Sequence, residues 1–344
     1  MAYTTIKKPS DYFNTKLYTG TGSATSITGV GFQPDWVWIK KRNGTTSHTV
    51  TDSVRGVNKQ LFTNEVEAEE SYTSVLTAFD SDGFSLSTAG LINASSDTYA
   101  SWNWLANGAG SANTDGATAS TVSANTTAGF SIVKYTGAGA TTYGHGLGAT
   151  PNMIIIKKLN SADDWFVYHH TLLTPSATQK QFILLNSTSA FASNGSATTF
   201  TSVSNSTFGV GTDDKISESG DSFIAYCFAE KQGYSKFGSY TGNGNADGTF
   251  VYTGFKPAFV MAKSSTSVTE WHMADTARRP NNPNDVYLAA SSSAAESTSN
   301  GVDFLSNGIK INTSQGGWNQ SGATFIYMAF AEEPLVGDNP ATAR

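Results

Sequence analysis

Short apolar runs separated by turn residues make up most of this chain. The runs are rich in Val, Ile, Tyr, Phe and Trp, and no long stretch carries an apolar stripe with the 3.6-residue period of a helix. Asp82-Gly83 and Asn307-Gly308 lie between apolar residues, which predicts two β-hairpins because both residues of each pair tolerate positive φ. The pattern therefore predicts an all-β protein built from antiparallel strands.

One series of motifs occurs three times in the same order. Each copy runs from a Tyr-Thr-Gly tripeptide, through a proline 16 or 17 residues later, into an apolar strand that ends in lysine. The prolines are Pro34, Pro151 and Pro257. Each copy closes with a second apolar strand, at 99–106, 223–230 and 325–332. The repeat predicts three tandem modules of about 100 residues, each a small antiparallel β-sandwich of jelly-roll or lectin-like type. Modules in a row and modules packed about a pseudo-threefold axis both fit it.

Composition predicts the boundaries between these modules. Residues 1–16 carry three lysines and three aromatic residues, and we expect either an arm that docks on a partner or a strand that caps the first module. Residues 107–127 are almost entirely Gly, Ala, Ser, Thr and Asn, which predicts a flexible or extended linker. The modules then span 17–106, 128–231 and 232–334, followed by a tail at 335–344.

Charge and cysteine content exclude several classes of protein. The net charge is −6 and only 14% of the residues are charged, so no basic surface for nucleic acid is expected. Cys227 is the single cysteine, which rules out a disulfide framework and a cysteine-based zinc site. No stretch approaches the roughly 20 apolar residues of a membrane helix, and the first 16 residues lack the apolar core of a secretory signal. We therefore expect synthesis in a cytoplasm and no membrane insertion.

The sequence offers few groups for catalysis. His169 and His170 are adjacent, so on a regular strand they point to opposite faces and cannot share one metal ion. No motif of a hydrolase, metalloprotease or phosphate-binding loop occurs. We therefore expect no enzymatic activity, no cofactor and no metal.

Two acid–base pairs recur at one position of the repeat. Asp52 and Arg55 lie 18 and 21 residues after the first proline, and Asp275 and Arg278 have the same spacing from the third. The second module has His169 where the others have aspartate. This recurrence predicts a structural ion pair that ties a loop to its sheet.

Aromatic residues supply the candidate contact surface. Trp165 and Trp271 both lie 14 residues after the repeat proline, where the first module has His48. Exposed rings can stack on sugars, whereas the same rings at repeated strand positions can be core residues. The candidate surface-binding residues are Trp165, Tyr168, His169, His170, Trp271 and His272.

Several motifs resemble a family of proteins encoded by tailed phages of marine bacteria. The resemblance covers nearly the whole chain, and its motifs are Lys8-Pro9-Ser10-Asp11-Tyr12-Phe13, the Tyr-Thr-Gly elements, Asp52-Ser53-Val54-Arg55-Gly56, Gly144-His145-Gly146-Leu147-Gly148 and Pro340-Ala341-Thr342-Ala343-Arg344. Members are carried as virion structural proteins, often labelled tail or tail fibre proteins with a domain of unknown function. The family brings no catalytic or binding residues to transfer.

The resemblance implies a virion structural protein, with the tail favoured over the capsid. We expect it to contribute to binding a glycan or outer-membrane receptor on the host, to contact other virion proteins through the N-terminal arm, and to form a homo-oligomer, with a trimer favoured. Several copies would raise a weak affinity by avidity. The alternative is a capsid decoration or cement protein, or another purely structural virion protein, that binds no receptor.

Overall fold

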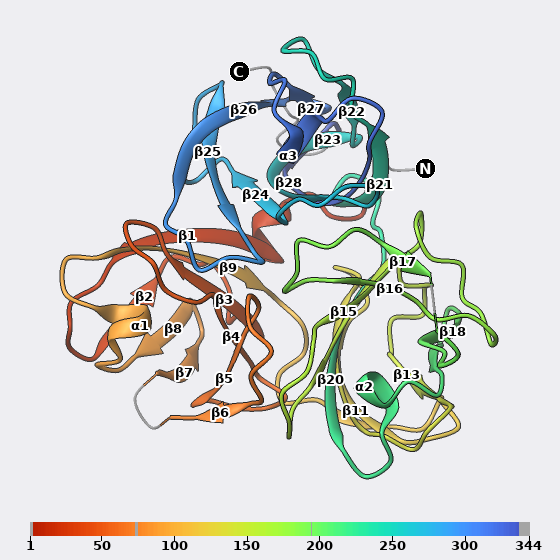
Figure 1. The fold of residues 1–344 in the computed structure, drawn as a ribbon. Coiled ribbons are helices and arrows are strands. Elements are labelled where there is room, and N and C mark those ends of the chain that lie inside the picture. Colours follow the sequence, from red (N-terminus) through yellow and green to blue (C-terminus); the bar gives the residue numbers. More distant parts are fainter. Residues whose placement is uncertain (1–2, 73–74, 194, 337–344) are drawn as a thin grey trace.

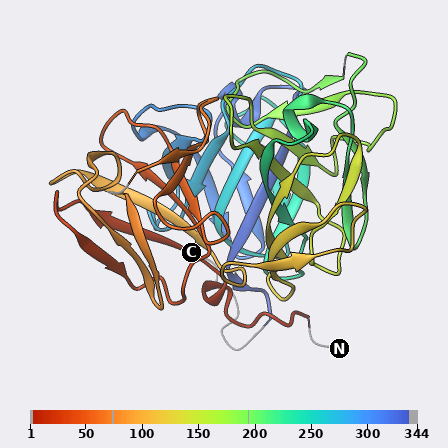
Figure 2. The same ribbon diagram turned by 90° about the horizontal axis from the view of Figure 1, so that it is seen from below.

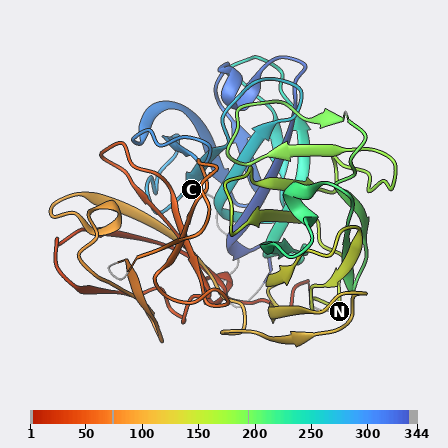
Figure 3. The ribbon, with the colours of Figure 1, turned by 60° about the horizontal axis from the view of Figure 1, so that its bottom comes forward.

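The computed structural model describes residues 3–72, 75–193 and 195–336. Over these residues the chain is all-β, with antiparallel sheets and three α-helices of a single turn. The sheets form three lobes, numbered here in chain order, which lie beside one another in each view (Figure 1, Figure 2 and Figure 3). The all-β class predicted from the sequence is therefore confirmed.

Each lobe contains one short helix and at least seven strands. Lobe 1 consists of β1 (Phe13–Thr19), β2 (Thr25–Thr28), β3 (Trp36–Lys41), β4 (Thr49–Asp52), β5 (Lys59–Phe62), β6 (Glu70–Ser71), β7 (Leu76–Asp80), β8 (Gly83–Leu86), α1 (Gly90–Asn93) and β9 (Thr98–Trp104). Lobe 2 consists of β10 (Ser111–Asn113), β11 (Ser120–Asn125), β12 (Phe130–Thr136), β13 (Thr141–Gly144), β14 (Met153–Lys158), β15 (Phe166–His169), β16 (Gln181–Leu184), β17 (Ala192–Ser193), β18 (Phe200–Val203), β19 (Thr207–Val210), α2 (Asp214–Ser217) and β20 (Ser222–Phe228). Lobe 3 consists of β21 (Ser235–Thr241), β22 (Phe250–Tyr252), β23 (Phe255–Ser264), β24 (His272–Asp275), β25 (Asn284–Ala289), β26 (Ser297–Leu305), β27 (Gly308–Ile311), α3 (Gly316–Asn319) and β28 (Thr324–Pro334).

The strands follow one order in the three lobes. Lobe 1 has the sheets β1-β9-β3-β4-β5-β6 and β2-β8-β7, and lobe 2 has β10-β11-β12-β20-β14-β15-β16-β17 and β13-β19-β18. In lobe 3 the strands join in one sheet, β21-β28-β23-β24-β25-β26-β27-β22. In every lobe the last strand lies between the first strand of the repeat and the apolar strand near the repeat proline. The three registers also agree, since Trp36 pairs with Asp52, Met153 with His169 and Phe259 with Asp275.

The apolar strand of each lobe is buried on both faces. In β3, Trp36 and Trp38 enter a cluster shared by all three lobes, while Val37 and Ile39 enter a cluster that belongs to lobe 1. Strands β14 and β23 divide their side chains in the same way. Because successive side chains of a strand point to opposite faces, two buried faces require a continuous apolar run. This is the reason for the unbroken apolar sequences after the three prolines.

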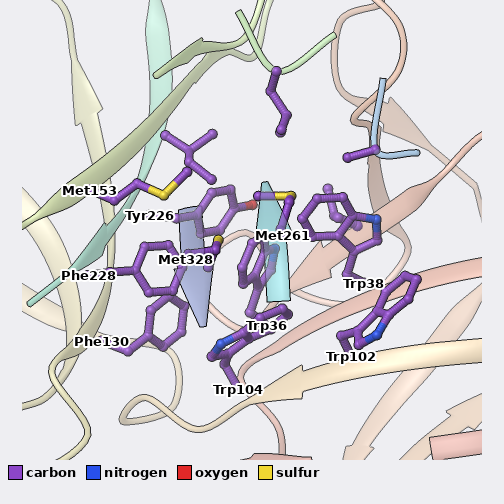
Figure 4. Packing of buried hydrophobic residues seen from close by; sticks show 14 of the residues in the cluster. Trp36, Trp38, Trp102, Trp104, Phe130, Met153, Tyr226, Phe228, Met261 and Met328 are labelled. Carbon is purple, nitrogen blue, oxygen red and sulfur yellow. The ribbon is translucent and has the colours of Figure 1, made fainter. Parts of the chain in front are cut away.

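Aromatic rings and methionines from three lobes form the shared cluster (Figure 4). The ring centroids of Trp36 and Tyr226 lie 4.4 Å apart, and those of Trp104 and Phe330 lie 5.7 Å apart. These contacts join lobe 1 to lobe 2 and lobe 1 to lobe 3. The lobes therefore share a core.

The N-terminal segment bears on the two alternatives for residues 1–16, an arm that docks on a partner and a strand that caps the first module. Ile6 is 1% exposed and belongs to the shared cluster, and the Tyr3 hydroxyl donates to the carbonyl of Gly254 at 2.5 Å. Phe13 begins β1, and its ring stacks on Phe330 at 4.9 Å. The short 3-10 helix η1 (Pro9–Asp11) lies on one side of the three lobes (Figure 2). Residues 3–16 thus pack on their own chain rather than forming a free docking arm, because their apolar side chains fill the core.

The prediction of a flexible or extended linker at 107–127 is wrong. It contains β10 and β11, and β11 pairs with β10 on one side and β12 on the other. Its small residues fit close backbone contacts: a Cβ on Gly116 would lie 2.4 Å from the carbonyl oxygen of Thr142. The composition that predicted a linker therefore belongs to the edge of a sheet. Of the predicted tail, residues 337–344 lie outside the described residues.

Candidate functional site

Trp165 and Trp271 are interior residues. They are 0% and 1% exposed, and each indole donates a hydrogen bond into the preceding lobe. Trp165 Nε1 donates to the carbonyl of Phe62 at 2.9 Å, and Trp271 Nε1 donates to that of Leu184 at 2.8 Å. These two rings join lobes and cannot form the contact surface expected from the sequence.

The paired histidines differ in burial, and neither belongs to a common surface with the two tryptophans. His169 is fully buried and donates from Nε2 to the carbonyl of Tyr327 in lobe 3 at 3.1 Å. Its Nδ1 accepts from the Thr171 hydroxyl at 2.9 Å, and burial lowers its pKa to about 3, so the ring is neutral. His170 is exposed and lies 3.0 Å from the carbonyl of Phe237, whereas Tyr168 is 5% exposed. The expected surface is therefore not assembled from these residues.

The recurrent acid–base pairs are confirmed as structural ion pairs. Arg55 Nε lies 2.5 Å from Asp52 Oδ2, and Arg278 Nε lies 2.5 Å from Asp275 Oδ2, with all four side chains fully buried. The backbone amides of both arginines also donate to the aspartates at 2.8 Å. Each pair therefore fixes the turn after β4 or β24 to its own strand, as expected.

The same position of the repeat links each lobe to another. Tyr226 of lobe 2 donates its hydroxyl to Asp52 of lobe 1 at 2.8 Å, and Trp102 of lobe 1 donates Nε1 to Asp275 of lobe 3 at 3.1 Å. His169 of lobe 2 completes the set through its bond to Tyr327 of lobe 3. The residues that recur in the sequence therefore hold the lobes together.

Of the candidate residues, His272 lines a pocket on the described surface. This hollow of about 290 Å³ lies in lobe 3 between α3, β24 and β25, whose places are labelled in Figure 1. The His272 ring lies 4.7 Å from that of Tyr287 and 5.5 Å from that of Trp318. Burial lowers the pKa of His272 to about 4, so its imidazole is neutral near pH 7. The pocket thus has three aromatic walls and no charged lining residue among the described side chains.

The equivalent places in lobes 1 and 2 are built differently. Strand register matches His272 with Thr49 of lobe 1 and Phe166 of lobe 2. In lobe 2, Lys180 Nζ lies 6.0 Å from the centre of the Phe166 ring and 5.3 Å from that of Phe182. Trp318 is matched by isoleucine in both of the other helices. Three aromatic walls around a hollow are therefore particular to lobe 3.

A glycine keeps this pocket open. Gly317 of α3 is matched by Leu91 in α1 and Lys215 in α2. A Cβ on Gly317 would lie 2.4 Å from Cε1 of His272, closer than real carbon atoms approach. Any other residue would displace the ring.

Trp318 lies where the other two copies of the repeat have Ile92 and Ile216, which is typical of a core position. The ring is 2% exposed in the core of lobe 3, and it also lines the pocket. Tyr287 and Gly317 were not singled out. The sequence does carry a signal, namely Gly-Trp in the third copy where the others have Leu-Ile and Lys-Ile.

Other chemistry is limited over the described residues. They contain no group of three or more His, Cys, Asp or Glu residues placed to hold a metal ion. Burial raises the pKa of the Cys227 thiol, which keeps it protonated and unreactive. No described helix has the length and apolar character needed to cross a membrane.

A family model matches most of the chain. The model of a domain of unknown function, DUF7483, matches residues 8–334. The chain belongs to this family. The DUF7483 match covers all three lobes, in keeping with their shared core. No curated protein and no solved structure matches the chain.

Proposed function

We propose that this protein is a structural component of a bacteriophage virion, with a tail or tail fibre position favoured, and that it contributes to binding the host surface. The sequence resemblance supports the virion assignment. The observation that carries surface binding is the uncharged aromatic pocket of lobe 3, at a place where lobes 1 and 2 have other side chains. A ligand pocket of this kind combines apolar walls with a few polar groups.

The proposed architecture is three tandem antiparallel β-sandwiches, of jelly-roll or lectin-like type, arranged about a pseudo-threefold axis. Equivalent backbone bonds between lobes support it. The backbone amide of Thr46 donates to the carbonyl of Ser293 at 3.0 Å. In the same way, the amide of Asp163 donates to the carbonyl of Val66 at 2.7 Å, and the amide of Thr269 donates to that of Thr188 at 3.0 Å. Each donor lies 12 residues after its repeat proline. The contacts therefore run from lobe 1 to 3, from 2 to 1 and from 3 to 2.

The proposed mode of action is binding rather than catalysis. Histidine is the side chain most often used for acid–base catalysis. His48 and His169 are fully buried between lobes, so a substrate cannot reach their imidazole nitrogens. A pocket open to solvent on one lobe is suited to weak reversible contact. A millimolar site becomes effective when several copies act together, so we also propose that the chain is displayed as an oligomer, with three copies favoured.

Two measurements test this proposal. Immunogold electron microscopy of phage particles, with antibody against the purified chain, should label the tail. Label spread over the capsid would instead select the decoration or cement function. In parallel, purified chain should compete with phage for adsorption to host cells.

The adsorption assay has a matched pair of variants. Gly317→Leu introduces the residue of lobe 1 and should abolish competition by filling the pocket. Lys215→Leu places a leucine at the equivalent position of lobe 2, where it removes an ion pair with Asp163 and leaves the lobe 3 pocket intact, so this variant should compete like the wild type. Equal competition by both variants would show that the pocket is not the receptor site.

A further inference from the structure

The pocket of lobe 3 differs from other hollows of the described surface in charge. Four of those are lined by ionisable side chains, which include Lys134, Glu332, Lys7 and Glu230. The lobe 3 pocket is lined by neutral groups only, and His272 carries no charge near pH 7 because it is 8% exposed. A charged ligand entering it would lose water without gaining a partner of opposite charge, which is unfavourable. The lining therefore selects a neutral ligand.

Its polar groups are of mixed hydrogen-bonding type. Gln315 and Gln320 are exposed at the rim, and each side-chain amide both donates and accepts. The Tyr287 hydroxyl does the same, and the Thr269 hydroxyl, which accepts from the Ser264 amide at 3.2 Å, has its proton to donate. A ligand that matches them carries several groups that also donate and accept, as alcohols do.

The walls add a requirement for an apolar face. Trp318 and His272 line the pocket with rings 5.5 Å apart at an interplanar angle of 39°, and they are 2% and 8% exposed. The Tyr287 ring, which meets His272 at 62°, is half-buried and offers the most accessible aromatic surface of the three. The negative faces of such rings attract the weakly positive C–H groups of a saturated ring. A pyranose has both properties, since its hydroxyls lie around a ring that shows C–H groups on its faces.

We propose that the pocket formed by His272, Tyr287 and Trp318 binds one neutral pyranose unit of a glycan. The proposal rests on the proposed surface-binding function and specifies its ligand class. Gly317 leaves room for the ligand, because any side chain at this position would collide with the His272 ring. The shallow pocket and its few polar groups imply an affinity near 1 mM.

The direct test is saturation-transfer NMR on the full chain with free sugars. The neutral probes are methyl glucoside, methyl galactoside and N-acetylglucosamine, and the anionic probes are glucuronic acid and N-acetylneuraminic acid. At least one neutral sugar should show saturation transfer at millimolar concentration, and the anionic sugars should show none. Absence of binding by all neutral probes up to about 50 mM, or stronger binding of an anionic one, would overturn the proposal.

Variants locate the binding. Gly317→Leu should weaken it at least tenfold, and Lys215→Leu should leave it unchanged. Gln320→Ala changes only an exposed rim residue, so it should weaken binding severalfold while the chain stays folded. Unchanged sugar binding in both Gly317→Leu and Gln320→Ala would place the site elsewhere.

The two proposals fail differently. Sugar binding that depends on Gly317, in a chain that does not compete for adsorption, would support the ligand assignment and reject the host-binding function. Competition that depends on Gly317, in a chain that binds no neutral sugar, would support the host-binding function and reject the ligand assignment.

Discussion

Asp275 gathers three hydrogen bonds in a fully buried position. It accepts from the side chain and backbone of Arg278 and from Trp102 Nε1 of another lobe. A buried charge of this kind is tolerable only while its partners stay in place. The repeat revealed the aspartate and arginine, but the partner across the lobe boundary lies 173 positions away and leaves no mark in the local sequence.

The substitution Asp275→Asn should destabilise the protein by about 3 kcal/mol, because it leaves the Arg278 guanidinium without its nearest counter-charge in the interior. Urea unfolding measures this. The control is Asp11→Asn, which breaks an exposed pair with Lys8 and should cost less than about 1 kcal/mol. Equal effects of the two substitutions would show that the buried pair contributes no more than a surface pair.

Buried histidines predict instability in acid. Burial lowers the pKa of His48, His169 and His272, in the last two to about 3 and about 4. As the pH falls below 6.5, the unfolded chain binds protons that the folded chain does not, so the unfolding free energy decreases. Between pH 7 and 5, His169 and His272 should each remove about 2 kcal/mol, and His48 should act in the same direction.

Chemical unfolding at several pH values checks the histidine prediction. His169→Asn should reduce the slope of stability against pH, whereas Val268→Ala, an exposed position without a titratable group, should leave it unchanged. An identical slope in wild type and His169→Asn would contradict it.

Strands and turns differ in how well the sequence predicts them. Hairpins form between β7 and β8 and between β26 and β27, where the sequence places them. Their two turn residues are Ser81-Asp82 and Ser306-Asn307, one position before the predicted pairs, and the glycines Gly83 and Gly308 begin the second strands. The continuous apolar runs correctly mark strands. They do not say which lobe covers each face of a strand. The repeated positions of Trp165 and Trp271 were therefore consistent both with an exposed contact surface and with the core. Pairing of β11 depends on β12 and on close backbone packing, which the small-residue composition conceals.

Amide hydrogen exchange of the segment 120–125 should be slow. These residues form β11, which has a partner strand on each side, so their amides are held in ladder hydrogen bonds. Mass spectrometry of peptides that span this segment, compared with a peptide from the exposed irregular segment at 177–180, measures it. Exchange of both peptides within seconds would show a linker instead of a strand.

The three lobes depend on one another through both backbone and core. Further backbone hydrogen bonds join the lobes, in addition to those from the turn after each apolar strand. The amide of Glu69 donates to the carbonyl of Leu159 at 2.8 Å, and the amide of Phe191 donates to that of Ser265 at 2.9 Å. The backbone amide of Glu296 donates to the carbonyl of Arg42 at 2.8 Å, and the side chains of the same two residues form an ion pair. The sequence predicted three similar units, yet it left a row and a ring equally possible, because a repeat specifies what each unit is and not which faces meet. The faces that meet are those of the shared cluster.

We therefore expect one cooperative unfolding transition for the whole chain. Phe84, Phe208 and Phe304 are fully buried in the separate cores of lobes 1, 2 and 3. Each substitution to alanine should cost about 3 to 5 kcal/mol and should shift the same transition, because loss of any lobe exposes the shared cluster. Val268→Ala is the control, since that side chain is 73% exposed.

Tryptophan fluorescence and far-UV circular dichroism, followed together in urea, make the cooperativity visible. Four of the seven tryptophans lie in lobe 1, so fluorescence reports largely on that lobe, while dichroism reports on strands of all three. In Phe304→Ala the two signals should move together to lower urea, although the substitution lies in lobe 3. Should dichroism shift while fluorescence keeps its wild-type midpoint, the lobes unfold independently, and the shared cluster contributes little to holding them together.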